Sequence, residues 1–319
     1  MIHWMSRRVT PIFLWLSIML FTSPAYAAAE SAAASGGGAE WPWWYWPLVL
    51  FVFCFVLGVL AVLAGVGGGV LYVPLVSAFF PFHLDFVRGA GLFVALAGAL
   101  MAGPGLLRRG LANLRLALPV ALIASACAIA GAFVGLTLPV SIVQILLGLT
   151  ILFIAILLAA SKNVEYPVVK KQDAIGLALG MHGGYLEETT GKVQEWKTHR
   201  TWVGLLIFVL IGFVAGMFGL GAGWANVPVL NLVMGAPLKL SVATSKFLLS
   251  ITDTSAAWVY LNKGALIPLI AIPSIVGLML GSLVGVKILA RAKPKAIRYI
   301  VIAVLLFAGG KALMKGLGM

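Results

Sequence analysis

The chain has 319 residues, of which 62% are apolar and only 10% carry a charge, and its mean hydropathy is strongly positive. A soluble domain has about 25% charged residues, so this composition excludes a soluble protein and indicates an integral membrane protein with many helical spans. The net charge of +13 would suggest a nucleic-acid partner for a soluble protein. Here the basic residues lie mostly between apolar runs, where the excess of Lys and Arg in cytoplasmic loops explains them. We therefore expect a lipid bilayer around this chain, and no nucleic acid.

The N-terminal 46 residues are expected to target the chain and to lead into its first span. Arg7 and Arg8 precede an apolar stretch, and Ala25-Tyr26-Ala27 has the small-x-small form of a cleavage site. Residues 1–27 are thus a signal peptide, or else an uncleaved first helix. Residues 28–46 form a flexible segment that ends in an aromatic interface belt, with a stacking platform for bases or sugars as the alternative. The expected location is the bacterial inner membrane.

Beyond residue 46 the chain consists of apolar segments in two groups of five. Transmembrane repeat 1, residues 47–160, holds segments at roughly 47–64, 70–80, 86–104, 114–138 and 139–160. Transmembrane repeat 2, residues 201–319, holds segments at roughly 201–218, 224–234, 240–261, 265–289 and 296–314. A polar cytoplasmic loop, 161–200, joins the two. The second segment of each group spans only about 16 Å as a helix, too short for ~30 Å of hydrocarbon, so we expect half-length re-entrant helices there.

A glycine motif precedes each short segment. Gly65, Gly67, Gly69, Val73 and Pro74 recur 154 positions later as Gly219, Gly221, Gly223, Val227 and Pro228. Each glycine costs a helix about 1 kcal/mol relative to Ala, so both motifs predict a broken helix. At membrane depth such a break is tolerated only where the freed backbone is buried in protein or lines a cavity. Matching breaks in two halves point to a transporter binding site, and close helix packing is the alternative.

The basic residues indicate that the two repeats have opposite orientations. Arg108, Arg109 and Arg115 surround the junction of the third and fourth segments in repeat 1, where repeat 2 has only Lys263. At the next junction repeat 2 is basic, and the matching stretch 133–144 has no charge. Because cationic loops share the cytoplasmic side, we predict inverted-topology repeats with about ten membrane segments after the signal-like N-terminus.

The third segment of repeat 2 carries the clearest ionisable groups at membrane depth, and such groups are candidates for function. Lys246 and Asp253 are seven positions apart and so lie on one helix face. Their counterparts in repeat 1 are Leu92 and Ala99, which makes the predicted site asymmetric. We interpret Lys246 as an anion-binding group and Asp253 as a proton-coupling group. The alternative is a structural polar seam in which Lys246 reaches the cytoplasmic interface.

The half-length helices supply a second way to bind an anion. They begin near Val70 and Trp224, which would place their N-termini close to the middle of the bilayer. Free N–H groups at a helix start are equivalent to about half a positive charge. Two such ends that face each other would attract a small oxyanion, with Tyr72, Asn226 and Asn231 as candidate hydrogen-bond donors.

The duplicated Gly-x-Gly-x-Gly break with a proline five residues on, together with Ala243-Thr244-Ser245, resembles the sulfite exporter TauE/SafE family, the TSUP transporters. The resemblance covers residues from about 50 to the C-terminus. It implies transport, largely outwards, of sulfur-containing anions such as sulfite, sulfonates and sulfoacetate-like compounds. By motif position it implies glycine turns at Gly65, Gly67, Gly69, Gly219, Gly221 and Gly223, and a polar pair at Thr244 and Ser245. The chain departs from the family at Ala90-Gly91, where the family often has polar residues, and in the longer loop 161–200.

We therefore predict an all-α polytopic membrane protein that exports a small sulfur-containing anion by alternating access, without a cofactor. The predicted substrate-binding residues are Gly65, Gly67, Gly69, Tyr72, Gly219, Gly221, Gly223, Asn226, Thr244, Ser245 and Lys246. Proton coupling through Asp253 and movement down the membrane potential are both open, as are a monomer and a homodimer. A membrane scaffold or assembly protein that uses the 161–200 loop, and a transporter of another small anion, are the alternatives.

An enzyme and a metal site are both disfavoured by the motifs. The chain lacks the HExxH metal pair, the GxSxG nucleophile turn and a pair of facing intramembrane aspartates. The spans hold no Cys/His/Glu cluster of the kind that binds transition metals. Cys54 and Cys127 both lie in apolar runs, where they are interpreted as small core residues.

Overall fold

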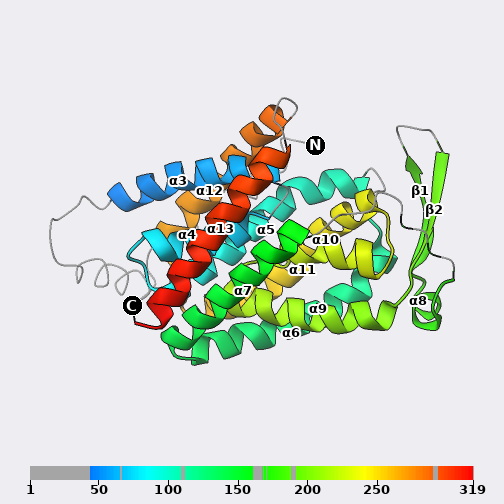
Figure 1. Cartoon of the computed structure of the whole chain (residues 1–319), viewed down its shortest axis with the longest axis horizontal. Helices are drawn as coiled ribbons and strands as arrows, with labels where there is room; N and C mark the ends of the chain where they lie inside the picture. Colours follow the sequence, from blue (N-terminus) through cyan, green and yellow to red (C-terminus); the bar gives the residue numbers. More distant parts are fainter. Residues whose placement is uncertain are drawn as a thin grey trace, which may run out of the picture.

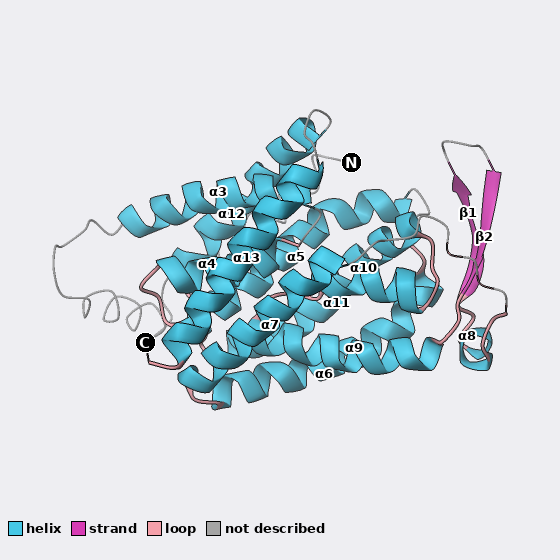
Figure 2. Cartoon of the chain, in the orientation of Figure 1, coloured by secondary structure: helices cyan, strands magenta, loops and turns pink. Residues whose placement is uncertain are grey.

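The structure, a computed structural model, describes residues 44–64, 67–108, 112–160, 167, 169, 171–187, 192–289 and 294–318. The predicted signal segment 1–27, most of the 28–46 segment and Gly65 lie outside the described residues. The described chain is a bundle of helices in which the two halves of the sequence interleave (Figure 1). Figure 2 shows that helices make up nearly all of it, apart from one small hairpin.

The helices fall on the apolar segments of the sequence. The first half contains α3 (Tyr45–Ala64), α4 (Gly68–Phe79), α5 (Leu84–Arg108), α6 (Leu114–Thr137) and α7 (Val140–Ala160). The second half contains α9 (Thr201–Phe218), α10 (Gly223–Pro228), the π-helical turn η1 (Val229–Val233), α11 (Leu238–Asn262), α12 (Pro268–Leu289) and α13 (Pro294–Gly316). Within the described residues, five helices are long and apolar enough to cross a membrane, namely α5, α6, α7, α9 and α12. The chain is thus a polytopic membrane protein, while α11 has the required length but carries Lys239, Lys246 and Asp253.

Two elements are too short to cross a bilayer on their own. Helix α4 has 12 residues, and α10 and η1 together continue for 6 and 5 residues. At 1.5 Å per residue each reaches only about 16–18 Å. A proline lies inside each half-length helix, Pro74 in α4 and Pro228 at the end of α10, next to the π-helical turn.

Helices from the two halves pack in reciprocal pairs. Helix α3 packs on α12 and α6 packs on α9, while α7 packs on α13 and α5 on α11. Glycines allow the closest of these contacts, because a Cβ at Gly277 or Gly281 would meet the backbone of α3. A Cβ at Gly212 or Gly216 of α9 would likewise meet the backbone of α6. Small residues of this kind let membrane helices approach to backbone contact.

The connection between the halves contains structure that an all-α prediction omits. It holds the short helix α8 (Ala174–Ala178) and two antiparallel strands, β1 (His182–Glu187) and β2 (Lys192–Lys197). The register pairs His182 with Lys197 at one end and Glu187 with Lys192 at the other. Figure 1 shows the hairpin at the end of the bundle where α9 begins. The expectation of an all-α chain is therefore corrected at this place, because the strands form in a polar segment without an apolar period.

Candidate functional site

The break between α9 and α10 depends on glycines with left-handed backbone. Helix α9 ends at Phe218, and Gly219 and Gly221 follow with φ of +68° and +69°. An L-residue with a side chain avoids this conformation because its Cβ approaches the following carbonyl. These two residues therefore allow the chain to leave one helix and to start another within four residues.

The starts of the two half-length helices lie against each other. A Cβ at Gly67 would be 3.9 Å from the Cα of Gly223, and a Cβ at Gly223 would be 3.8 Å from the Cα of Gly67. Gly67 precedes α4 and Gly223 begins α10. The first N–H groups of a helix have no partner four residues back. Those of Val70 and Ala225 donate within their own turns, each at 3.2 Å, to the carbonyl oxygens of Gly67 and Ala222. The N–H groups at the very start of each helix are therefore the candidate donors near this point.

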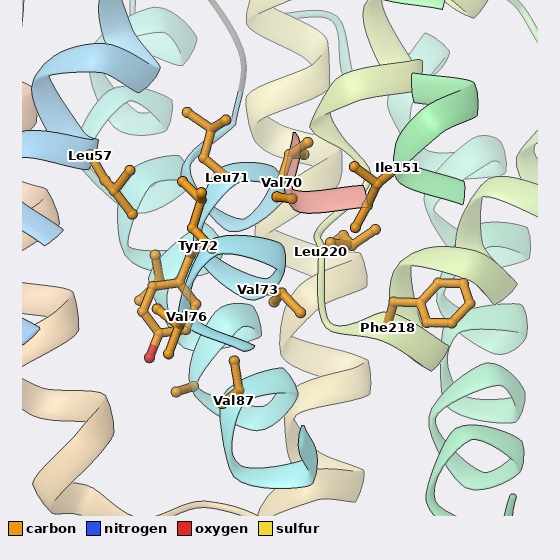
Figure 3. Packing of buried hydrophobic residues seen from close by; sticks show 14 of the residues in the cluster. Leu57, Val70, Leu71, Tyr72, Val73, Val76, Val87, Ile151, Phe218 and Leu220 are labelled. Carbon is orange, nitrogen blue, oxygen red and sulfur yellow. The ribbon is translucent and has the colours of Figure 1, made fainter. Parts of the chain in front are cut away.

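Helix α4 also packs directly on the α9–α10 break. A Cβ at Gly69 of α4 would be 2.5 Å from the carbonyl oxygen of Leu220, and one at Gly91 of the neighbouring helix α5 would be 2.6 Å from that of Gly219. Figure 3 shows Leu220 in the same apolar cluster as Val70 and Val73 of α4. The break is thus enclosed by protein, as an interrupted helix at membrane depth requires.

Two side chains satisfy the carbonyl groups that the break leaves free. Arg88 of α5 donates from Nη1 to the oxygens of Met217 at 2.8 Å and Gly135 at 3.1 Å, and it forms an ion pair with Asp85. Tyr260 of α11 donates from its hydroxyl to the oxygens of Gly216 at 3.0 Å and Met217 at 3.1 Å. Arg88 is only 1% exposed and is fixed by these contacts, so it stabilises the end of α9.

Besides Arg88, whose Nε has no partner, three side chains beside the break have buried polar atoms without a hydrogen-bond partner. Asp253 of α11 is 1% exposed, and both of its carboxylate oxygens are unpaired. Its Oδ2 would be 3.0 Å from a Cβ at Gly221. Asn226 of α10 is 1% exposed with both amide atoms unpaired, and Nε1 of Trp224 is unpaired as well. Such atoms cost about 1–3 kcal/mol each, and a ligand that reached them would remove that cost.

Lys246 does not pair with Asp253. The two side chains share a face of α11, but seven residues separate them by about 10.5 Å along the axis. In the described part of the chain no ion pair within 4.0 Å joins them. Lys246 is partly buried and lies nearer the start of α11.

The other predicted residues have partners away from the break. The Thr244 hydroxyl accepts from the backbone N–H of Asn113 at 3.3 Å, and its neighbour Ser245 is 2% exposed. The Tyr72 hydroxyl lies 3.1 Å from Oγ of Ser274 on α12. The structure therefore brings Gly67 and Gly223 together, sets Gly69 against Leu220 and places Asp253 beside Gly221, while Asn226 lies on the short helix that starts there. It places Thr244 and Tyr72 in separate contacts.

Sequence reasoning did not select Trp224 as a polar group or Arg88 as a helix-end partner. Trp224 directly follows the last glycine of the second motif, and this position is the only feature of the sequence that could have pointed to its indole N–H as part of the site. Among the described residues, no group of three His, Cys, Asp or Glu side chains is arranged to hold a metal ion. The chemistry available at the break is thus that of amide and indole N–H donors with one carboxyl group.

Comparison with known proteins identifies the family. A model described as "Sulfite exporter TauE/SafE" matches residues 50–312, which is most of the chain. The chain belongs to the TauE/SafE family. This match includes both half-length helices and all of the unpaired side chains at the break. No solved structure matches this TauE/SafE chain.

Three curated relatives have transporter names. The chain is 28% identical over 120 residues to "Probable membrane transporter protein YunE" of Bacillus subtilis, a match that spans 38% of this chain and 44% of that protein. It is 23% identical to "Probable membrane transporter protein MJ0441" of Methanocaldococcus jannaschii, over 81% of this chain and 92% of that protein. It is 27% identical to "Probable membrane transporter protein ORF9" of a Sinorhizobium species, over 80% of this chain and 87% of that protein. This TauE/SafE protein is thus similar to membrane transporters along most of its length.

Proposed function

We propose that this protein exports a small sulfur-containing anion, such as sulfite, a sulfonate or a sulfoacetate-like compound, across the bacterial inner membrane by alternating access. The family description supports a sulfur anion as substrate. The transporter names of the relatives support movement of a solute. The substrate-binding site in this proposal is the meeting point of α4 and α10.

One observation carries the proposal: the first turns of α4 and α10 meet at Gly67 and Gly223. Helix N-termini attract anions because their N–H groups are free and the helix dipole is positive there. Asn226 and Trp224 have unpaired N–H groups on the same short helix. An oxyanion between the two helix starts would receive donors from both, and apolar neighbours would keep competing water away.

The reciprocal packing of the helices supports inverted repeats. If α3 to α7 correspond to α9 to α13 in order, α3 against α12 is the counterpart of α9 against α6. The contact of α5 with α12 likewise corresponds to that of α11 with α6. A pseudo-two-fold axis in the membrane plane produces this pattern. In this arrangement one repeat rocks against the other around the shared site.

Two lysines at the C-terminus lie on the predicted external side, against the rule for basic residues. Nζ of Lys315 contacts the carbonyl oxygen of Ser77 at 3.4 Å, and Nζ of Lys311 lies 4.8 Å from the centre of the Phe79 ring. Both contacts are at the C-terminal end of α4. A cation is favourable there because the helix dipole is negative at that end, so these two charges have a local reason and do not contradict the topology.

We propose Asp253 as the group that couples anion movement to protons. An ionised carboxylate without a partner is costly inside a protein, and a bound anion nearby would raise that cost further. Movement down the membrane potential without protons is the alternative, since the potential favours anion export by ~2.3 kcal/mol per charge per 100 mV. A pH gradient imposed on vesicles distinguishes the two mechanisms.

Flux in proteoliposomes tests this function. Purified protein should move labelled sulfite or taurine, and Lys246→Ala should reduce the rate at least tenfold because the proposed path loses the cation that shares a helix face with Asp253. Lys263→Ala is the matched control, since Lys263 is exposed at the far end of α11, and it should keep the parent rate. Asp253→Asn should make the rate independent of a pH gradient. Parent rates in Lys246→Ala would remove that residue from the site, and no anion flux from the parent would refute the function.

A topology reporter tests the orientation. A fusion in the 103–113 region should read cytoplasmic, because Arg108, Arg109 and Arg115 flank it. A second reporter after Asn262 should read external. Helix α11 starts at the cytoplasmic end of the bundle, so Asn262 at its other end lies on the external side. An external reading of the first reporter would invert the proposed topology.

A further inference from the structure

The segment that connects the two halves covers one end of the bundle. We call residues 171–184 and 194–200 the loop plug, which comprises α8 and the lower part of the hairpin. Two of its side chains are buried among the helices, Met181 at 0% and Trp196 at 4% exposed. They belong to an apolar cluster with residues from the starts of α6 and α11 and from the η1–α11 turn, namely Leu116, Ala117, Val120, Met234, Ala236 and Leu240.

Polar contacts attach the loop plug at its base. The Asp173 carboxylate accepts from the Thr201 backbone N–H at 2.9 Å and from the Thr201 hydroxyl at 2.8 Å, which caps the start of α9. The His199 backbone N–H donates to the carbonyl oxygen of Met234 at 3.0 Å. The loop plug is therefore held to α9 and to the turn that follows η1. The η1 turn continues α10, and the proposed anion site lies at the start of α10.

The loop plug also lies against the α5–α6 turn. A Cβ at Gly183 would be 3.7 Å from both Nδ2 of Asn113 and Cζ2 of Trp196. Asn113 in turn is bonded to Thr244 on α11. One contact network thus joins the hairpin to the starts of α6 and α11 at the end of the bundle that the charges place in the cytoplasm.

Two features indicate that the loop plug can withdraw from the helices it covers. Arg200, between β2 and α9, has a φ of +52°, the only left-handed conformation of a non-glycine residue among the described residues. Gly180, before β1, has a φ of +65°. Glycine adopts this conformation without strain, whereas the strain at Arg200 persists only when its surroundings hold it, and such strain is common in switch regions. Nε1 of Trp196 and Nδ1 of His199 are buried without a partner, so withdrawal into water would hydrate both.

We propose that the loop plug is the cytoplasmic gate of the transporter, with Trp196 as the side chain that seals it and Gly180 and Arg200 as its hinges. This inference rests on the proposed function for its purpose, but the seal itself can be tested without a substrate. The gate closes the space under η1 and α11 when Trp196 and Met181 are inserted. It opens the route from the cytoplasm to Lys246 and Asp253 when they withdraw.

Thiol labelling tests the seal. In the full chain with Cys54→Ala and Cys127→Ala, an Ala236→Cys reporter lies under the plug, because Ala236 is 0% exposed. A membrane-impermeant maleimide should label it at least tenfold faster when Trp196→Ala is added. Trp202→Ala is the matched control, since Trp202 of α9 is 57% exposed, and it should leave the rate unchanged. Equal labelling with and without Trp196 would overturn the gate.

Cross-linking tests the movement in the same background. Asn113→Cys and Gly183→Cys, bridged by a short reducible thiol reagent, should lower anion flux at least tenfold, and reductant should restore it. Each single variant treated with the same reagent should keep the flux of the parent. If the cross-linked protein keeps the anion flux of the parent, the loop plug does not need to move during transport, and the proposal is overturned. The labelling result stands whether or not sulfite is the anion, so it separates failure of the gate from failure of the proposed function.

Discussion

Replacing Gly221 by leucine is expected to abolish anion flux and to lower the thermal stability of the protein sharply. Gly221 has a φ of +69°, and a Cβ there would lie 2.9 Å from Cβ of Ala95 and 3.0 Å from Oδ2 of Asp253. The left-handed backbone costs a residue with a side chain about 1–2 kcal/mol, and overpacking adds about 1–3 kcal/mol. Thermal unfolding of the purified variant, together with sulfite flux, measures both effects.

Gly264→Leu is the control that separates strain from crowding. Gly264 has nearly the same backbone, with a φ of +68°, but a Cβ there would meet no atom within 4 Å. The Gly264→Leu variant should lose only the ~1–2 kcal/mol of folding stability that the left-handed backbone costs, and it should keep the anion flux of the parent. Equal losses at both positions would mean that the space beside Asp253 is unimportant and that only the turn matters.

Replacing Arg88 by leucine is expected to be the most destabilising change of a charged residue in the described part of the chain. Its guanidinium group satisfies the carbonyl groups of Gly135 and Met217 and pairs with Asp85. Without it, the buried carbonyl groups of Gly135 and Met217 lose a charged donor, and a buried acceptor left without its partner costs about 1–3 kcal/mol. The melting temperature of the detergent-purified variant is the measurement.

Arg88→Lys and Arg115→Leu complete that test. A lysine keeps the charge but lacks the planar fork that donates to several acceptors at once, so it should recover only part of the stability. Arg115 is exposed, and its replacement should leave the melting temperature within the error of the parent. Parent-like stability of Arg88→Leu would show that water or lipid satisfies the end of α9 instead.

The sequence allowed the helix breaks to be located because their cause is local. Glycine at positions 219 and 221 is needed for positive φ, and α9 indeed ends at Phe218 directly before them. The shared face of Lys246 and Asp253 followed from helical periodicity alone. Features of this kind need no knowledge of which helices are neighbours.

The contacts of individual side chains depended on distant partners and were not foreseen. Arg88 reaches Met217, which is 129 positions away, in addition to its near neighbour Asp85. Thr244 is bonded to Asn113 across 131 positions, and Tyr72 to Ser274 across 202. A pattern within one segment cannot reveal such partners, because they are set by how the two halves interleave.

The hairpin in the connecting loop was missed for a different reason. Its strands are polar and contain the pair Gly183 and Gly184, which weakens the strand signal. Among the strand residues whose burial the structure describes, Trp196 is the one that is buried, and its neighbours Glu195 and Lys197 are exposed. Contacts with the helix bundle therefore stabilise this hairpin more than its own sequence does.

The position of a bound anion is the most direct test of the proposed site. The purified protein should be crystallised with selenite, a heavier analogue of sulfite whose anomalous scattering locates it. We expect a peak between the first turns of α4 and α10, within hydrogen-bond distance of their backbone N–H groups and beside Asn226. Selenite bound elsewhere in the transport path, with no density between Gly67 and Gly223, would contradict it.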